Sequence, residues 1–223
     1  MRSAFSTGAT IVSTLRAGAR LAAGGLVLAA ALLGETGASA QTLASLPLAA
    51  QAATVTGAAR PILAWVEFCE RYASECAVDP SEPTEIVLTP ALWQTLNSVN
   101  RRVNKAVRAV TDLDHWRAAD RWDLAEDGRG DCEDFQLLKR HELAAAGLPR
   151  RAMRMTVVVD EKGEGHAVLT VMTSRGDVVL DNKTSQILPW RQTGYTFIKR
   201  ESQDATGWVA LGRDVSPTTT ANR

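Results

Sequence analysis

The clearest hydrophobic periodicity lies between residues 89 and 110. Thr89 and Pro90 predict a helix start, because threonine is a favoured N-cap and proline suits the first helical position. Apolar side chains then recur every three or four residues, as they do on one buried helix face: Trp93, Leu96, Val99, Val103, Val107 and Val110. The pattern predicts an amphipathic helix that packs on the core and carries no chemistry.

A second helix is expected further along the chain. Residues 111–130 are rich in aspartate and glycine and are expected to form a loop. A helix is then predicted from Asp131 to Ala146, because Gly147 and Pro149 are typical of the residues that follow a helix end.

Beyond residue 150 the hydrophobic period changes from about four to two. Strands are predicted at 153–159, 167–172, 178–180, 195–200 and 208–211, separated by glycine-containing turns. Helices followed by an antiparallel meander predict an α+β fold, with N-terminal helices packed on an antiparallel sheet.

The N-terminus has a different pattern. Three arginines in the first twenty residues precede an apolar run at 21–33, and Ala38-Ser39-Ala40 supplies small residues for cleavage. This pattern predicts a signal peptide over residues 1–40, a mature N-terminus at Gln41 and a periplasmic protein. A membrane anchor is the alternative, but the apolar run is short for a bilayer span. Cleavage would leave no membrane span.

The 223 residues suit one ordinary domain. Residues 41–60 are rich in alanine and threonine and are expected to be a linker or flexible arm. The catalytic domain is expected at 61–212, and residues 213–223 are expected to form a flexible tail. The formal net charge is zero and no basic patch is evident, so we expect no nucleic-acid partner.

The three cysteines fall into a pair and a single residue. Cys69 and Cys76 are close in sequence, and an oxidising compartment favours a disulfide between them, worth about 2–3 kcal/mol of loop-closure entropy. The alternative is two unpaired packing cysteines. Cys132 has no obvious partner and needs another explanation.

Cys132 lies where a glycine-containing loop meets the start of a predicted helix, in the sequence Gly130-Asp131-Cys132-Glu133-Asp134. The positive end of the helix dipole and the free backbone N–H groups favour the reactive thiolate there. The same N–H groups could hold an oxyanion. The position is that of a nucleophile, although position alone leaves a structural thiol equally open.

A nucleophilic cysteine needs a base, and the chain has three histidines. His141 lies nine residues along the same helix, about 13 Å away at 1.5 Å per residue, and His115 lies in the predicted loop. His166 opens a strand, and Asp181 ends the next strand after a tight turn. Adjacent antiparallel strands would bring these two side chains together as a base and its orienting acid.

Three motifs together resemble a known family. They are Gly-Asp-Cys132-Glu-Asp-Phe with Lys139 following, Gly-His166-Ala-Val-Leu and Val-Leu-Asp181-Asn182. In this order they resemble the bacterial transglutaminase-like cysteine proteinases, over residues 61–208. The resemblance implies a papain-like or transglutaminase-like core with Cys132, His166 and Asp181 as catalytic triad.

The resemblance also implies a biological setting. Members of the family are calcium-dependent endopeptidases that trim large surface adhesins under the control of an inner-membrane receptor for a cyclic dinucleotide. A large adhesin is therefore the implied protein substrate, and such a receptor the implied regulator. The segment around Cys69 and Cys76 is similar to a subgroup whose substrates are mostly unassigned.

Calcium is also suggested by charge. Asp131, Glu133 and Asp134 crowd the thiol of Cys132 and, without a counter-ion, would raise its pKa. A divalent cation held by oxygen ligands would remove this effect, and Asp131 and Glu133 are the expected ligands. The alternative is that these acids simply suit the first turn of a helix.

Three other functions are compatible with parts of the same residue pattern. A zinc site formed by Cys132, His166 and Asp181 lacks the ligand spacing of known zinc sites. Acyl transfer to an amine, as in transglutaminases, would use the same triad and stays open. A catalytically silent binding module is disfavoured because all three triad positions are intact.

Overall fold

The computed structural model describes residues 46–211, so the expected signal peptide and tail lie outside the described residues. The helices are α1 (Leu63–Arg71), α2 (Ala73–Cys76), α3 (Pro90–Ala106), α4 (Asp112–Trp116) and α5 (Cys132–Ala145), with short 3-10 turns η1 (Arg150–Ala152) and η2 (Trp190–Gln192). The strands are β1 (Gly57–Ala59), β2 (Arg108–Ala109), β3 (Arg129–Gly130), β4 (Met153–Val159), β5 (Gly165–Val171), β6 (Val178–Leu180), β7 (Leu188–Pro189), β8 (Thr196–Glu201) and β9 (Trp208–Ala210).

Seven strands form one antiparallel sheet in the order β1-β9-β8-β4-β5-β6-β7. The α+β class is thus confirmed, but the predicted meander runs only from β4 to β7. The chain then returns and places β8 on the other edge of β4, where β9 and β1 extend the sheet. Pairing with β8 supplies hydrogen-bond partners to the backbone N–H and C=O groups on the second edge of the buried strand β4.

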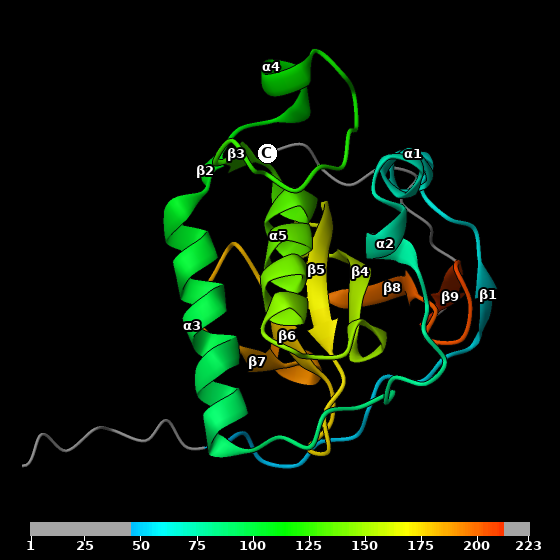
Figure 1. Ribbon diagram of the computed structural model, residues 1–223, viewed down its shortest axis with the longest axis vertical. Coiled ribbons are helices and arrows are strands. Elements are labelled where there is room, and N and C mark those ends of the chain that lie inside the picture. The colour runs from blue at the N-terminus through cyan, green and yellow to red at the C-terminus, as the bar shows by residue number, and fades with distance from the viewer. Residues whose placement is uncertain (1–45, 212–223) are drawn as a thin grey trace, which may run out of the picture. The chain divides into compact units, whose positions relative to one another are not determined.

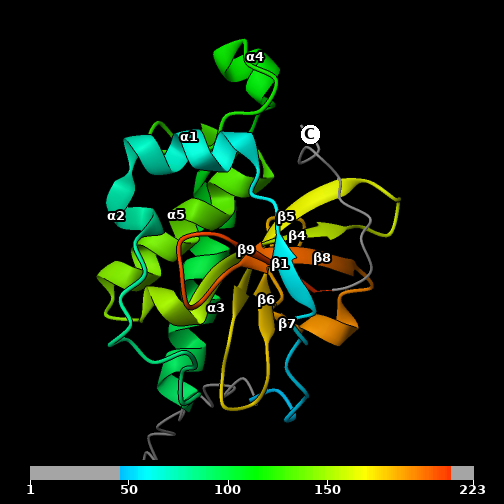
Figure 2. The ribbon, with the colours of Figure 1, turned by 90° about the vertical axis from the view of Figure 1, so that its right-hand side faces the viewer.

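The helices α1, α2, α3 and α5 lie on one side of this sheet, as Figures 1 and 2 show. Helix α5 packs against β5 and β4, and α3 packs on α5. Apolar side chains fill the space between helices and sheet, and a smaller cluster covers the opposite face: Val158, Val168, Val179 and Phe197. Strand β4 is therefore buried on both faces, although Arg154 and Thr156 interrupt its apolar sequence.

Helix α3 begins as predicted, with the Thr89 Oγ1 accepting a hydrogen bond from the Leu92 N–H at 3.2 Å. It ends at Ala106, before Val110, because β2 pairs in parallel with β3 immediately afterwards. The segment predicted as a loop also contains α4, which begins at Asp112. The early end of α3 has a tertiary cause, because β3, about twenty residues downstream, supplies partners that a local pattern does not reveal. The start of α4 is capped locally, with Thr111 Oγ1 accepting from the Asp114 N–H at 3.2 Å.

The segment expected to be a linker contains structure from residue 46 onward. Strand β1 pairs with β9, and the Ala53 N–H donates to Asp177 Oδ2 at 2.9 Å. The Ala50 carbonyl lies so close to Gly176 that a Cβ at this position would collide with its oxygen. The alanine-rich sequence does not signal these contacts, because they are made by backbone atoms.

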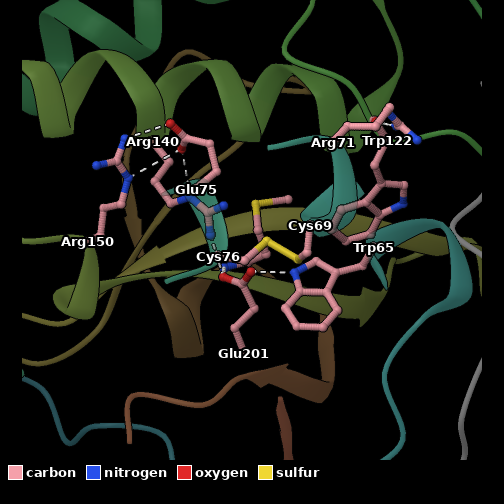
Figure 3. Close-up of a disulfide and its surroundings, with 10 residues drawn as sticks. Trp65, Cys69, Arg71, Glu75, Cys76, Trp122, Arg140, Arg150 and Glu201 are labelled. Carbon is pink, nitrogen blue, oxygen red and sulfur yellow. Dashed lines mark hydrogen bonds and ion pairs between the residues drawn. A yellow bond between two sulfur atoms is a disulfide. The ribbon is translucent and has the colours of Figure 1, made fainter. Parts of the chain in front are cut away.

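The predicted disulfide joins Cys69 in α1 to Cys76 in α2 (Figure 3). In the same region, the fully buried Arg140 of α5 lies between the buried carboxylates of Glu75 and Glu201. Its Nη1 donates to Glu201 Oε2 at 2.5 Å, and its Nε lies 4.0 Å from Glu75 Oε2. These ion pairs tie α2, α5 and β8 together. None of the helices in residues 46–211 combines the length and the apolar character that a membrane span requires.

Candidate active site

Cys132 is the first residue of α5, and Asp131 is its N-cap. The Asp134 carboxylate accepts the backbone N–H of Asp131 at 3.4 Å, and a Cβ on Gly130 would lie 2.5 Å from Asp134 Oδ2. Glycine is therefore needed directly before the cap. The helix start holds the thiol side chain in the layer between α5 and the sheet, where only 3% of the residue is exposed.

The environment of the Cys132 thiol opposes ionisation. Its Sγ lies 3.1 Å from Glu133 Oε2, to which it donates. Burial is the main cause that raises the thiol pKa well above its ordinary value, and the charges of Glu133 and Asp131 act in the same direction. The sequence pointed to the carboxylates, whereas the structure adds desolvation as the larger effect.

His166 and Asp181 are joined by a hydrogen bond of 2.9 Å between Nε2 and Oδ1. His166 is the second residue of β5, and Asp181 follows β6 directly; the register that pairs Leu169 with Leu180 places the two side chains near each other. Both residues are buried. Because Nε2 is engaged by Asp181, Nδ1 is the ring nitrogen left to face a reacting group.

Asp181 is held as a carboxylate by several donors. Burial alone would raise its pKa, but the hydrogen bonds from His166, from the Lys183 backbone and from Tyr195 outweigh burial and lower it. The Tyr195 hydroxyl donates to Asp181 Oδ2 at 2.7 Å, and its ring meets the His166 ring edge-on with centroids 5.7 Å apart. Tyr195 therefore covers the pair and fixes the carboxylate.

Cys132 and His166 line the same pocket of about 410 Å³. One wall is the turn between β4 and β5, with Glu161, Lys162, Glu164 and Gly165, and the other wall is formed by Asn182 and Lys183. The buried Asp160 carboxylate accepts from the Lys183 ammonium and from the Glu164 N–H, and so it ties the two walls together.

Behind the pocket, α5 carries two buried polar side chains on the same face as the thiol. Gln136 Nε2 donates to Asn182 Oδ1 at 3.2 Å, and Lys139 Nζ donates to Gln136 Oε1 at 3.1 Å. Both Gln136 and Lys139 are fully buried. Burial lowers the pKa of Lys139 to about 7, although the negative charge of Asp181 acts in the opposite direction.

A cluster of acidic side chains lies beside the start of α5. Carboxylate oxygens of Asp112, Asp131 and Asp134 approach within 4.8 Å of one another, and so do those of Asp112, Asp120 and Glu133. The two expected ligands, Asp131 and Glu133, thus fall in two groups that share Asp112. Helix α4 and the segment after it supply Asp112 and Asp120, which the sequence analysis did not name as ligands.

The donor set of this cluster fits a hard divalent cation. Both oxygens of Asp131, Glu133 Oε1 and Asp112 Oδ1 are buried and accept no hydrogen bond of acceptable geometry from the described residues. Burial, aided by the charge of Asp112, raises the pKa of Asp131 to about 7. Burial and the charge of Asp131 likewise raise the pKa of Glu133 and of Asp134. So many buried carboxylates can be ionised together only if a positive charge lies close to them.

Comparison with known proteins identifies the chain. The model of one family, described as bacterial transglutaminase-like cysteine proteinase, matches residues 54–216. The chain belongs to this family. The bacterial transglutaminase-like cysteine proteinases are thiol proteases, so the protein is a cysteine peptidase that acts on a protein substrate. No curated protein matched the chain.

Solved structures similar to this chain include Legionella pneumophila LapG in three forms. The calcium-bound form is 25% identical with a TM-score of 0.47, covering 56% of this chain and 75% of LapG. A form described simply as LapG is 25% identical with a TM-score of 0.45, covering 55% and 70%. The EGTA-treated form is 24% identical with a TM-score of 0.46, covering 58% and 72%.

In this bacterial transglutaminase-like cysteine proteinase the other two histidines lie away from the pocket. His141 is half-exposed on α5, and its Nδ1 lies 2.8 Å from Glu75 Oε1. His115 was expected in a loop where nothing fixes it, but it belongs to α4. Its ring is only 4% exposed, and Nε2 lies 2.8 Å from Asp127 Oδ2.

Several residues around the site were missed by sequence reasoning. Tyr195, Gln136 and Asp112 each reach the site from an element whose local pattern indicates only a strand start, a helix or a loop. The density of aspartates between 111 and 134 was the one available signal for Asp112 and Asp120. Nothing in the local sequence distinguishes Tyr195 from an ordinary strand residue.

Proposed function

We propose that Cys132, His166 and Asp181 form the catalytic triad of this cysteine endopeptidase. The observation that carries the proposal is the pocket lined by Cys132 and His166, with His166 held by Asp181 through a 2.9 Å hydrogen bond. A nucleophile, a base and an orienting acid in this order suit acyl transfer from a peptide bond.

In the proposed reaction, His166 Nδ1 takes the thiol proton and the Cys132 sulfur forms a bond to the peptide carbonyl carbon. Backbone N–H groups at the start of α5 hold the resulting oxyanion. His166 then gives its proton to the leaving amine as the carbon–nitrogen bond breaks. A water attacks the thioester, its proton passes to His166, and the acid product leaves as the thiol is restored.

The proposal is tested by labelling with a thiolate-reactive epoxide and by proteolysis. Cys132→Ala should abolish labelling, and His166→Ala should slow it about 10²-fold or more, because the base is lost. His141→Ala is the matched control, since it removes a histidine from α5 outside the pocket. Equal labelling of the wild type and of a correctly folded His166→Ala variant would contradict the proposed triad.

We also propose that the acidic cluster holds calcium. Asp112, Asp131, Asp134, Asp120 and Glu133 offer only oxygen ligands, which a hard cation of flexible coordination prefers. Bound calcium would supply positive charge beside Cys132 and so offset the effect of the carboxylates on its thiol. The proposal rests on the buried carboxylate oxygens of Asp112, Asp131 and Glu133, for which residues 46–211 supply no well-aligned hydrogen-bond donor, although the Asp131 carboxylate faces the Asp134 N–H at the helix start.

Calcium binding can be measured without any activity assay. Calorimetric titration should show binding to the wild type, and the free energy of unfolding should rise by about 2.7 kcal/mol at a calcium concentration of 100 Kd. Asp112→Asn should weaken binding strongly. Asp114→Asn removes the same charge from an exposed position of α4 and should leave binding unchanged. Equal affinities for the two variants would refute the site.

The proposed cellular role follows the family resemblance: export to the periplasm after cleavage at Ala40, and trimming of a large surface adhesin under an inner-membrane receptor. Protein recovered from the periplasm should begin at Gln41. Incubation with a large repetitive secreted adhesin from the same organism should give a discrete fragment that the Cys132→Ala variant does not produce. Full-length chain confined to the cytoplasm would contradict the export proposal.

A further inference from the structure

Three polar side chains form one stripe on the face of α5 that meets the sheet. They are Cys132, Gln136 and Lys139, spaced by four and three residues, so they lie one above the other along the helix. The stripe continues to Asn182, which lines the pocket together with Cys132. Two amides and an ammonium are therefore hydrogen-bonded in a row from the pocket wall into the core, beginning at Asn182, which shares the pocket with Cys132.

The buried end of this stripe sets the direction of its hydrogen bonds when Lys139 is charged. Lys139 Nζ donates to Gln136 Oε1 at 3.1 Å, and in its ammonium form Lys139 can only donate, so the Gln136 oxygen faces it. The Gln136 Nε2 group must then point the other way, and it donates to Asn182 Oδ1 at 3.2 Å. Because Gln136 and Lys139 are fully buried, no water competes for these positions.

The direction of these hydrogen bonds determines how the Asn182 amide is oriented. Its oxygen is occupied by Gln136, so its Nδ2 group is directed away from the core. Among residues 46–211 this group has no hydrogen-bond acceptor, and the residue is only partly buried in the pocket wall. A donor beside the nucleophile is what a peptide carbonyl, or the oxyanion derived from it, requires.

We propose that Asn182 is a substrate-contacting residue, whose Nδ2 group donates to the carbonyl oxygen of the peptide attacked by Cys132. Gln136 and Lys139 are positioning residues that set the polarity of Asn182 from the core. The inference rests on the proposed triad, since it assumes that the attacked carbonyl lies next to Cys132.

Two substitutions separate this role from a purely structural one. Gln136→Glu keeps the shape and gives Lys139 a charged partner, but it removes the N–H that holds Asn182 Oδ1. Asn182 should then turn its amide group toward Glu and its oxygen toward the pocket. Asn182→Ala removes the donor and adds no charge. Asn97→Ala, on α3 and away from the pocket, is the matched control.

Two thiol reagents provide the readout. Methyl methanethiosulfonate reacts with the Cys132 thiolate and releases methanesulfinate, and it has no carbonyl group to be polarised. A peptidyl acyloxymethyl ketone forms a carbon–sulfur bond with the same thiolate and loses a carboxylate, and its reaction requires a polarised ketone carbonyl. The ratio of the two second-order rates therefore isolates carbonyl recognition from thiolate formation.

Asn182→Ala and Gln136→Glu should each lower the ratio of ketone rate to thiosulfonate rate by about tenfold or more. The double variant should show little further loss, because both substitutions remove the same donor. The melting temperature of Gln136→Glu should not fall. Asn97→Ala should leave the ratio unchanged.

An unchanged ratio in folded Asn182→Ala would overturn the proposal and leave the triad intact. A loss in Asn182→Ala with none in Gln136→Glu would overturn the positioning of Asn182 by the core. If the wild type reacts with the thiosulfonate but not with the ketone, the proposed peptidase mechanism fails first, and this inference fails with it.

Discussion

Asp181 accepts more hydrogen bonds than its proposed role of orienting His166 would require. Asp181 accepts from His166, from the Lys183 backbone and from Tyr195. Each donor favours the carboxylate, and together they outweigh the burial that would otherwise favour the protonated form. The direction of the His166 ring therefore depends on groups that lie on three different segments of the chain.

The Tyr195→Phe substitution tests this dependence. It keeps the ring that meets His166 and removes the hydroxyl that donates to Asp181 at 2.7 Å. Losing a hydrogen bond to a charged group costs about 1.5–3 kcal/mol, so we expect a lower melting temperature and about tenfold slower labelling of Cys132. Raising the Asp181 pKa should move the acid limb of the labelling profile to higher pH.

Tyr72→Phe is the matched control, because Tyr72 also donates to an aspartate, Asp123, but away from the pocket. Measured at saturating calcium, it should leave the labelling profile in place. If Tyr195→Phe behaves like Tyr72→Phe, the hydroxyl has no part in holding Asp181.

At this scale the sequence names candidate groups, and the structure adds their surroundings. Cys132, His166 and Asp181 could be named as candidates because each stands beside a turn or a helix start. In the structure Cys132 and His166 line one pocket, and His166 is joined to Asp181. Asp112 could not be named as a ligand, because only the pairing of β2 with β3 brings α4 beside Asp131. Local patterns do not encode such long-range pairings.

Among the elements, α5 has the most varied role. Its first turn carries the thiol, one face carries Gln136 and Lys139, and the buried Arg140 joins it to β8 through Glu201. Glu201 also accepts from Trp65 Nε1 at 2.6 Å (Figure 3). The Met155 N–H donates to it at 2.9 Å. Removing either partner of such a buried ion pair would leave the other charge buried without compensation and would destabilise the fold.

Substitution of Glu201 by glutamine should destabilise the protein strongly. Among residues 46–211 it leaves the fully buried Arg140 charge with Glu75, at 4.0 Å, as its remaining ion-pair partner, so we expect a loss of about 3–5 kcal/mol in the free energy of unfolding. Urea unfolding would measure it. Glu142→Gln removes a partner from the exposed pair with Arg102 and should cost about 0–1 kcal/mol. Similar losses in both variants would contradict this account of the network.

Long elements with a clear hydrophobic period could be predicted from the sequence, whereas short or irregular ones could not. Helices α3 and α5 and strands β4, β5, β6, β8 and β9 were predicted within a few residues, because each has a clear apolar period. Helices α1, α2 and α4 and strand β1 are short or irregular and were not predicted. Their positions are set by a disulfide, by buried charges and by backbone pairing with distant strands.

For the whole molecule, the acidic cluster links stability to pH and calcium. Burial raises the pKa of Asp131 to about 7, above that of an unfolded aspartate, so the folded protein without metal binds more protons than the unfolded chain between about pH 4 and pH 7. Without calcium, the free energy of unfolding should therefore fall as the pH rises through this window. Glu133 and Asp134 act in the same direction.

Calcium should flatten this pH dependence, because a bound cation stabilises the ionised carboxylates. Chemical unfolding at pH 5 and pH 7.5, with chelator and with calcium, would measure the difference, and each unit of pKa shift corresponds to about 1.4 kcal/mol. Magnesium should restore less stability, since it requires stricter octahedral geometry. Stability in chelator that rises from pH 5 to pH 7.5 would show that the cluster does not govern the response.

Strand β1 has a consequence for self-association. It is three residues long and covers the outer edge of β9, which is followed inward by the longer β8. A version of the protein that starts at Pro61 would keep every residue of the pocket, yet it would present the β9 edge with unpaired N–H and C=O groups. Such an edge is a template for pairing with another copy. We expect the shortened protein to form dimers and larger aggregates on size-exclusion chromatography while its thiol still reacts.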